Sequence, residues 1–142
     1  MTVRAIAYAS QAAGALSAEK VEQIAENARV FNLVAGVTGV LLFDGTRFLQ
    51  YIEGPGDALD AAYSRILYAR SHCEIMELMR GTLRGRLFPY WSMRCLPTPE
   101  PMLSRVANSD WRSFMRRGPG HLSNGTAVDQ LSAIVEQHLR AA

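Results

Sequence analysis

The first 96 residues alternate between two spacings of apolar side chains, one typical of strands and one typical of helices. Short apolar runs rich in β-branched residues predict strands at 3–8, 37–43, 46–53, 74–79 and 90–96. Apolar residues three and four apart predict a helix that starts after Ser17 and ends before Gly36, and a second helix that begins at Pro55. Asp44 and Gly45, between two strands, predict a hairpin turn.

The order of these elements is β-α-β-β-α-β followed by one further strand. It predicts an α+β fold, in which a ferredoxin-like unit has a mixed five-stranded sheet with two helices on one face. The same architecture supports many unrelated activities, so the fold by itself does not identify a function.

Three prolines, Pro97, Pro99 and Pro101, mark the end of this unit. We therefore expect a domain over residues 1–96 and a helical extension over residues 97–142. Residues 103–115 predict one or two short helices, broken by Asn108, and residues 116–120 predict a turn or a flexible link. A final amphipathic helix is predicted from apolar residues at helical spacing, namely Val128, Leu131, Ile134 and Val135. We expect this helix to pack on the sheet face that the first two helices leave bare, or on a partner.

Length and composition describe an ordinary globular chain. Its 142 residues are 49% hydrophobic and 20% charged, which is enough for one core. A formal charge of +2 is too small to predict nucleic-acid binding. The N-terminus lacks a signal-peptide pattern and no apolar run reaches the roughly 20 residues that span a bilayer, so we expect a cytoplasmic protein without membrane contact. Cys73 and Cys95 with His72 fall short of a zinc site's four ligands, so no metal is predicted and both cysteines are interpreted as packing residues.

The sequence contains no common catalytic motif, since G-x-S-x-G, a P-loop and H-E-x-x-H are all absent. Glu53 closes a predicted strand, where a solvated strand end is a better interpretation than a general base. Arg84, Arg86 and Arg94 are interpreted as a solvated face. On these grounds we do not expect an enzyme.

Three polar residues lie where a core is expected to be apolar. Tyr8 ends an apolar strand, and Gln50 shares one strand face with Phe48 and Ile52. A buried polar group without a hydrogen-bond partner costs about 1–3 kcal/mol. Asn32 ends the first predicted helix, a position that suits a C-cap. Taken singly, Tyr8 is interpreted as a half-buried core aromatic and Gln50 as an edge residue, whereas together the three predict a ligand near the ends of neighbouring strands.

Segments in a fixed order resemble the BLUF family of blue-light sensors that use FAD. They are I-A-Y-A-S at 6–10, Asn32, V-T-G-V-L-L at 37–42, F-L-Q-Y-I-E-G at 48–54 and F-P-Y-W-S-M at 88–93. The similarity runs from residue 3 to about residue 96, and F-L-Q-x-x-E-G combined with W-S-M at this separation is specific. The resemblance implies a sensor that is not an enzyme, with a noncovalent FAD whose ring lies between the two helices.

The resemblance also implies roles for individual residues. Tyr8 matches the redox-active tyrosine, which gives up an electron and a proton after blue light is absorbed. Gln50 matches the switching glutamine, which ends rotated or tautomerised with a stronger bond to the flavin C4=O and a red-shifted absorbance. The other matches are Asn32 at the pyrimidine edge, Ile24 and Ile66 on the two ring faces, Arg65 and His72 along the pocket, and Trp91 and Met93 as the pair that passes the signal outward.

Two positions depart from the family pattern. Phe31 stands where many relatives have a polar residue, and Ala69 stands where relatives usually have an aspartate. Both departures bear on flavin affinity and on the rate of dark recovery. The tail after Pro97 resembles that of short BLUF proteins, which signal through partners and often self-associate. An unidentified downstream protein and a homo-oligomer are therefore implied.

Three other interpretations compete with this one. A cofactor-free interaction module of the same fold would make Tyr8 and Gln50 structural residues. An acylphosphatase-like enzyme would need a loop arginine and a phosphate-binding nest, and residues 10–16 contain neither. An RNA-binding sheet would need paired exposed aromatics with basic flanks, which the predicted central strands lack.

Overall fold

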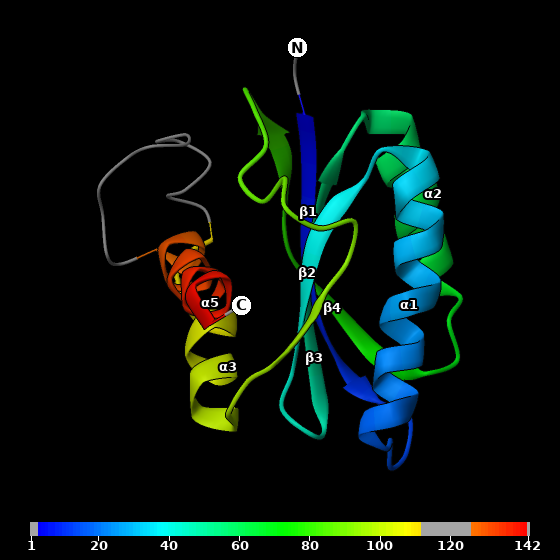
Figure 1. Cartoon of the computed structure of the whole chain (residues 1–142), viewed down its shortest axis with the longest axis vertical. Helices are drawn as coiled ribbons and strands as arrows, with labels where there is room; N and C mark the ends of the chain where they lie inside the picture. Colours follow the sequence, from blue (N-terminus) through cyan, green and yellow to red (C-terminus); the bar gives the residue numbers. More distant parts are fainter. Residues whose placement is uncertain (1–2, 112–125, 142) are drawn as a thin grey trace.

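The computed structural model describes residues 3–111 and 126–141, which form three layers around one sheet (Figure 1). Helices α1 and α2 cover one face of the sheet, and α3 and α5 cover the other. The strands are β1 (Val3–Ala12), β2 (Thr38–Phe43), β3 (Arg47–Gly54), β4 (His72–Leu83) and β5 (Cys95–Pro97). The helices are α1 (Ala18–Ala35), α2 (Gly56–Leu67), α3 (Glu100–Ala107) and α5 (Ala127–Ala141).

The sheet has five strands in the order β4-β1-β3-β2-β5. β1 pairs antiparallel with β3 and β4, β2 pairs antiparallel with β3, and β5 pairs parallel with β2. This mixed sheet with two helices on one face confirms the predicted ferredoxin-like α+β fold. Because β3 lies between β1 and β2, Gln50 is in a central strand, and its interpretation as an edge residue is wrong.

The predicted start and end of α1 and the predicted start of α2 agree with the structure. The Ser17 hydroxyl accepts a hydrogen bond from the Lys20 amide at 3.1 Å, which satisfies one N–H of the first turn. Gly36 ends α1 with φ 76°, in the left-handed region that glycine adopts at little cost. Pro55 precedes α2, where its missing N–H is no loss.

Side chains of successive strand residues point to opposite faces, so the sheet separates two cores. The core under α1 and α2 includes Ile6, Val21, Leu41, Ile52 and Leu59. The core under α3 and α5, here called the cap core, includes Leu42, Leu49, Tyr51, Phe88, Leu103, Leu131 and Ile134. The apolar stripe of α5 therefore packs on the sheet face that the first two helices leave bare, which was one of its two predicted positions.

The last predicted strand is mostly wrong. β5 contains three residues, and residues 84–94, here called the crossing segment, run irregularly beside the edge of β2. Gly39 N donates to Trp91 O at 3.0 Å, and Leu41 N donates to Arg94 O at 2.9 Å. The segment does not continue as a regular strand because it passes from the cap core, where Phe88 lies, to the opposite core, where Met93 lies.

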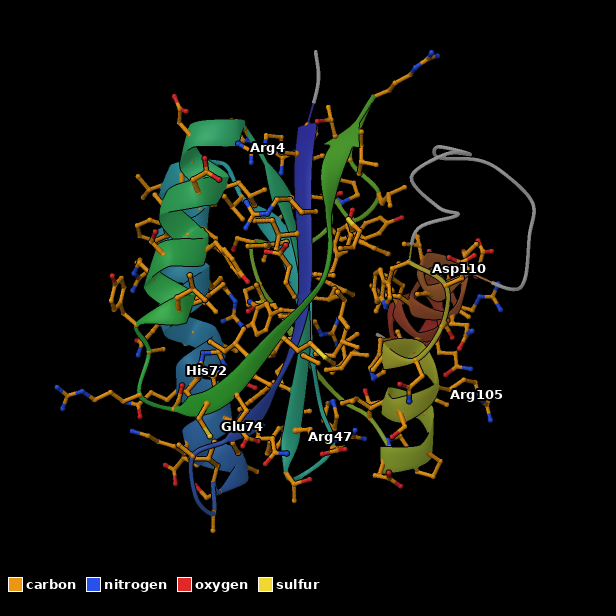
Figure 2. The ribbon with its side chains drawn as sticks, turned by 180° about the vertical axis from the view of Figure 1, so that it is seen from behind. Arg4, Arg47, His72, Glu74, Arg105 and Asp110 are labelled. Atoms are coloured by element: carbon orange, nitrogen blue, oxygen red, sulfur yellow. The ribbon has the colours of Figure 1, made fainter. Side chains whose placement is uncertain are left out.

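The α3 helix is joined to the β2–β3 hairpin. Arg47 Nη2 donates to Ser104 Oγ at 2.5 Å, and Thr98 N donates to Phe43 O at 2.9 Å. Figure 2 shows Arg47 at the hairpin end of the sheet, on the side where α3 lies. The predicted break after α3 is observed at its C-cap, Asn108. The predicted turn at 116–120 and the end of the predicted helical region 103–115 lie outside the described residues.

Glu53, Arg86 and Cys73 do not have the surroundings that the sequence predicted. Glu53 is buried, and Arg86 donates hydrogen bonds to three groups, so neither belongs to a solvated strand end or face. Cys73 is exposed and is not a packing residue, whereas Cys95 packs against the α1 and α2 core, where burial raises its pKa to about 11. Within 3–111 and 126–141, no helix is long and apolar enough to cross a membrane.

Candidate cofactor site

A cavity lies between α1, α2 and the sheet face that these helices cover. Its volume is about 240 Å³, slightly below the roughly 300–1,000 Å³ common for ligand pockets. All seven residues that the sequence assigned to cofactor binding line it, namely Tyr8, Ile24, Asn32, Gln50, Arg65, Ile66 and His72. The other lining residues are Asn27, Ala28, Phe31, Leu41, Phe48, Ala62, Ala69 and Ser71.

Tyr8 and Gln50 face each other at the inner end of the cavity. They are direct partners in the register of β1 and β3, and the Tyr8 hydroxyl donates a hydrogen bond to Gln50 Oε1. Only 3% of Tyr8 and 4% of Gln50 is exposed. Burial, with a smaller effect from Tyr63, raises the pKa of Tyr8 far above its usual value. The phenol therefore stays protonated and acts as the donor of this bond.

The other end of the Gln50 amide contacts Met93. Gln50 Nε2 donates to Met93 Sδ at 3.4 Å, and Met93 is only 1% exposed. Trp91 is half-buried and packs against the cap core, with the Arg94 guanidinium carbon 4.8 Å from its ring centroid. Met93, and not Trp91, is thus the residue of this pair that contacts Gln50.

His72 is held through both ring nitrogens. Nε2 lies 2.8 Å from the carbonyl oxygen of Ile66, which only accepts, so Nε2 donates. Nδ1 lies 2.6 Å from Ser10 Oγ. The ring centroid is 5.7 Å from that of Tyr8, and Figure 2 shows His72 between β4 and the helical layer of α1 and α2. These contacts fix the orientation of the imidazole beside the Tyr8–Gln50 pair.

Asn32 connects α1 to the crossing segment. Its Nδ2 donates to Ser92 O at 2.8 Å, and in the previous turn Arg29 Nε donates to Met93 O at 2.9 Å. Gly36, and not Asn32, is the C-cap of α1, so the capping interpretation of Asn32 is wrong. The buried Asn32 side chain instead lies at the junction of the cavity and the residues before β5.

Three lining residues that the sequence did not assign to the cofactor could have been found from helix periodicity. Asn27, Ala28 and Phe31 follow Ile24 at helical spacing, so one stripe of α1 runs along the cavity. The Phe31 ring packs against Arg65, whose guanidinium carbon is 4.2 Å from the ring centroid. Among the described residues that line the cavity, Arg65 is the only permanently charged one.

The chemistry of the lining fits a flavin. The isoalloxazine ring has two apolar faces and a polar edge of carbonyl and N–H groups. Ile24 and Ile66 supply apolar contacts, and the amides of Asn32 and Gln50 supply hydrogen-bonding groups. Among the residues that the structure describes, no group of three or more His, Cys, Asp and Glu side chains could hold a metal ion.

The comparisons agree with this chemistry. Residues 3–94 match the family model of BLUF, sensors of blue light using FAD, and the chain therefore belongs to the BLUF family. Its cofactor is FAD, and it is a blue-light sensor, as the sequence motifs predicted.

Similar proteins include the blue light- and temperature-regulated antirepressor BluF of Escherichia coli K12. It is 34% identical over 70 residues, which are 49% of this chain and 17% of that protein. The photoactivated adenylate cyclase subunit alpha of Euglena gracilis is 32% identical over 78 residues, 55% of this chain and 8% of that protein. Among solved structures, the BLUF protein BlrB in its dark state superposes with a TM-score of 0.72 at 29% identity, covering 96% of each chain. The chain thus spans less than a fifth of the length of these curated relatives.

Proposed function

We propose that Tyr8, Gln50 and Met93 form the light-sensitive hydrogen-bond chain of this sensor. The observation that supports the proposal is the chain of contacts itself, from the Tyr8 hydroxyl to Gln50 Oε1 and from Gln50 Nε2 to Met93 Sδ. Tyr8 and Gln50 line the inner end of the cavity, and Met93 lies behind Gln50. A change in the hydrogen bonding of one residue therefore alters the contacts of the other two.

Five further lining residues are proposed to hold the FAD. Ile24 and Ile66 provide apolar contacts, Asn32 provides hydrogen-bonding groups, and Arg65 and His72 complete the pocket. When bound, FAD supplies the absorption of blue light and an electron acceptor.

Tyr8 is the proposed donor of an electron and of the proton on Oη. In the dark its raised pKa keeps this proton on the phenol. Loss of an electron makes a phenol strongly acidic, and Gln50 Oε1 is already in place as an acceptor. The proton therefore passes along an existing hydrogen bond to Gln50 Oε1 before any side chain moves, and on recombination the electron and the proton return to Tyr8.

Gln50 is the proposed two-state element. Its amide presents an acceptor to Tyr8 and a donor to Met93, and a half turn about the last side-chain torsion exchanges the two. A thioether sulfur is only a weak acceptor, so the Met93 contact adds little to the preference for the first orientation. Since a neutral hydrogen bond contributes about 0.5–1.5 kcal/mol net, the two orientations are close enough in free energy for a local change to bias them.

The proposed output is an altered contact with a separate downstream protein, without any reaction catalysed by this chain. Support comes from the crossing segment, which connects Met93 to the cap core and so to the layer of α3 and α5. Self-association, the division of the chain at residue 96 and a cytoplasmic location stay predictions.

Absorbance spectroscopy of the purified chain tests the proposal. The protein should be yellow, its flavin spectrum should shift to the red under blue light, and the shift should decay in darkness. Gln50→Leu should keep the flavin and lose the red shift, and Tyr8→Phe should abolish the normal photocycle. A colourless protein that takes up no added FAD would overturn the assignment, and an intact shift in Gln50→Leu would remove Gln50 from the mechanism.

A further inference from the structure

Glu53 is a fully buried carboxylate on the opposite face of β3 from Gln50. It is 0% exposed, and its neighbour Tyr51 donates to Oε1 through the phenol at 3.0 Å. Two consecutive backbone amides complete its surroundings, Leu87 N at 3.0 Å from Oε1 and Phe88 N at 2.7 Å from Oε2. Each carboxylate oxygen therefore accepts from a different amide at the start of the crossing segment.

Arg86 fixes the same stretch from the other side. Its Nη1 donates to Thr38 Oγ1 at 2.8 Å and to the Glu53 carbonyl oxygen at 3.3 Å. Its Nη2 donates to the carbonyl oxygen of Gly36, the C-cap of α1. Residues 86–88 are thus tied to the ends of α1, β2 and β3.

The other end of the crossing segment is tied to the cofactor side. Ser92 O and Met93 O accept bonds from Asn32 and Arg29, and Met93 Sδ accepts from Gln50. Between the two anchored ends, Tyr90 is 53% exposed. The segment therefore has one end that contacts Gln50 and one end held by buried polar groups.

We infer that Glu53 is a positioning residue of the light response, which holds residues 87 and 88 in place while Met93 moves. With that end held, a displacement at Met93 has to be taken up by the residues between and by the cap core. Without this anchor, the whole crossing segment would move together with Met93, and the displacement of α3 and α5 would be small. The inference rests on the proposed role of Gln50 and Met93.

A carboxylate suits this position because two adjacent N–H groups need two acceptor oxygens. In Glu53→Gln the shape is kept, but one oxygen is replaced by an NH₂ group that meets a backbone donor. The Tyr8 and Gln50 side chains lie on the other face of the sheet and keep their contacts. The variant therefore separates the anchor from the photochemistry.

Hydrogen exchange measured by mass spectrometry on the full, FAD-loaded chain, in darkness and under steady blue light, tests the inference. In the wild type, light should raise exchange in the crossing segment and in α3. Glu53→Gln should keep the red shift but reduce the light-minus-dark difference in α3 and α5 at least threefold. A purely structural role would change exchange equally in light and darkness. Glu19→Gln, which removes the same charge from an exposed position, is the matched control and should behave as wild type.

Two results would overturn the inference: an unchanged light-minus-dark difference in Glu53→Gln, or loss of its red shift, which would place its effect in the cavity. If Glu53→Gln does not fold, Glu53→Asp replaces it, since it keeps the carboxylate but draws both acceptor oxygens back by one methylene from the amides of Leu87 and Phe88. An unchanged difference in that variant would also refute the anchor. Absence of any red shift in the wild type would instead overturn the proposed function.

Discussion

The Tyr8–Gln50 hydrogen bond allows a quantitative test by a double-mutant cycle. Tyr8→Phe removes the donor and leaves Gln50 Oε1 buried without its partner. Gln50→Leu removes the acceptor and leaves the Tyr8 hydroxyl unpaired. Removing one partner of a buried hydrogen bond costs about 1–3 kcal/mol, so each single variant should lose about that much free energy of unfolding.

The double variant should lose much less than the sum of the two single losses. Replacing both partners of a buried bond by apolar groups of similar shape is nearly neutral, because no unsatisfied group is left. With about 2 kcal/mol for each single change, a double variant that costs about 2 kcal/mol or less gives a coupling of at least about 2 kcal/mol. The 3.4 Å contact of Gln50 Nε2 with Met93 Sδ involves a weak acceptor and adds little to this balance.

Urea unfolding followed by circular dichroism measures these energies. All four proteins are compared in darkness at one saturating FAD concentration, and the FAD dissociation constant of each is measured so that the stabilisation by ligand can be subtracted. A coupling within about 0.5 kcal/mol of zero, the usual scatter for independent sites, would refute a Tyr8–Gln50 bond in the dark state.

Two further predictions concern cofactor affinity and pH. Phe31→Ala removes the ring against which the Arg65 guanidinium packs. Because a cation–π contact contributes about 0.5–1 kcal/mol, its loss should weaken FAD binding about two- to fivefold, as measured by fluorescence titration. An unchanged dissociation constant would contradict this prediction. Burial raises the pKa of the Glu53 carboxyl above its usual 4.5, although backbone N–H bonds from Leu87 and Phe88 oppose the shift. Between pH 4.5 and the raised pKa, the folded chain therefore keeps a proton on Glu53 that the unfolded chain has lost. The free energy of unfolding should therefore fall as pH rises from 4.5 through the raised pKa, by at most about 1.4 kcal/mol per pH unit from this group. Urea unfolding at several pH values measures this slope, and Glu53→Gln should remove it. A slope that is unchanged in the variant would show that other groups cause it.

Local patterns predicted most of the fold because they depend on neighbouring residues in the sequence. The Ser17 cap, the end of α1 at Gly36 and the apolar stripe of α5 follow from helix geometry and from turn chemistry, and all are found in the structure. The seven residues proposed to bind the cofactor could be named because they lie in or near motifs whose order resembles that of the family. Their arrangement around one cavity depends on which strands become neighbours, which periodicity does not specify.

The errors arise where tertiary structure overrides the pattern. Trp91 and Met93 are two positions apart, so a strand would place both on one face, yet the irregular crossing segment turns them toward opposite cores. A glutamate at the end of a strand is expected to be exposed to solvent. Glu53 is instead buried, and its carboxylate is paired with the amides of Leu87 and Phe88, which are far away in the sequence. No local signal predicts such long-range partners.

The alternation of side chains along β3 has a consequence for how such a sensor can be modified. Phe48, Gln50 and Ile52 belong to the cofactor side, whereas Leu49, Tyr51 and Glu53 belong to the cap side. Substitutions on the two sides share few contacts, so their effects should combine nearly additively. Under the proposed mechanism, substitutions at one set of positions should change colour and recovery time, and substitutions at the adjacent set should change the strength of the output. Two properties of the sensor could thus be changed separately within a single eight-residue strand.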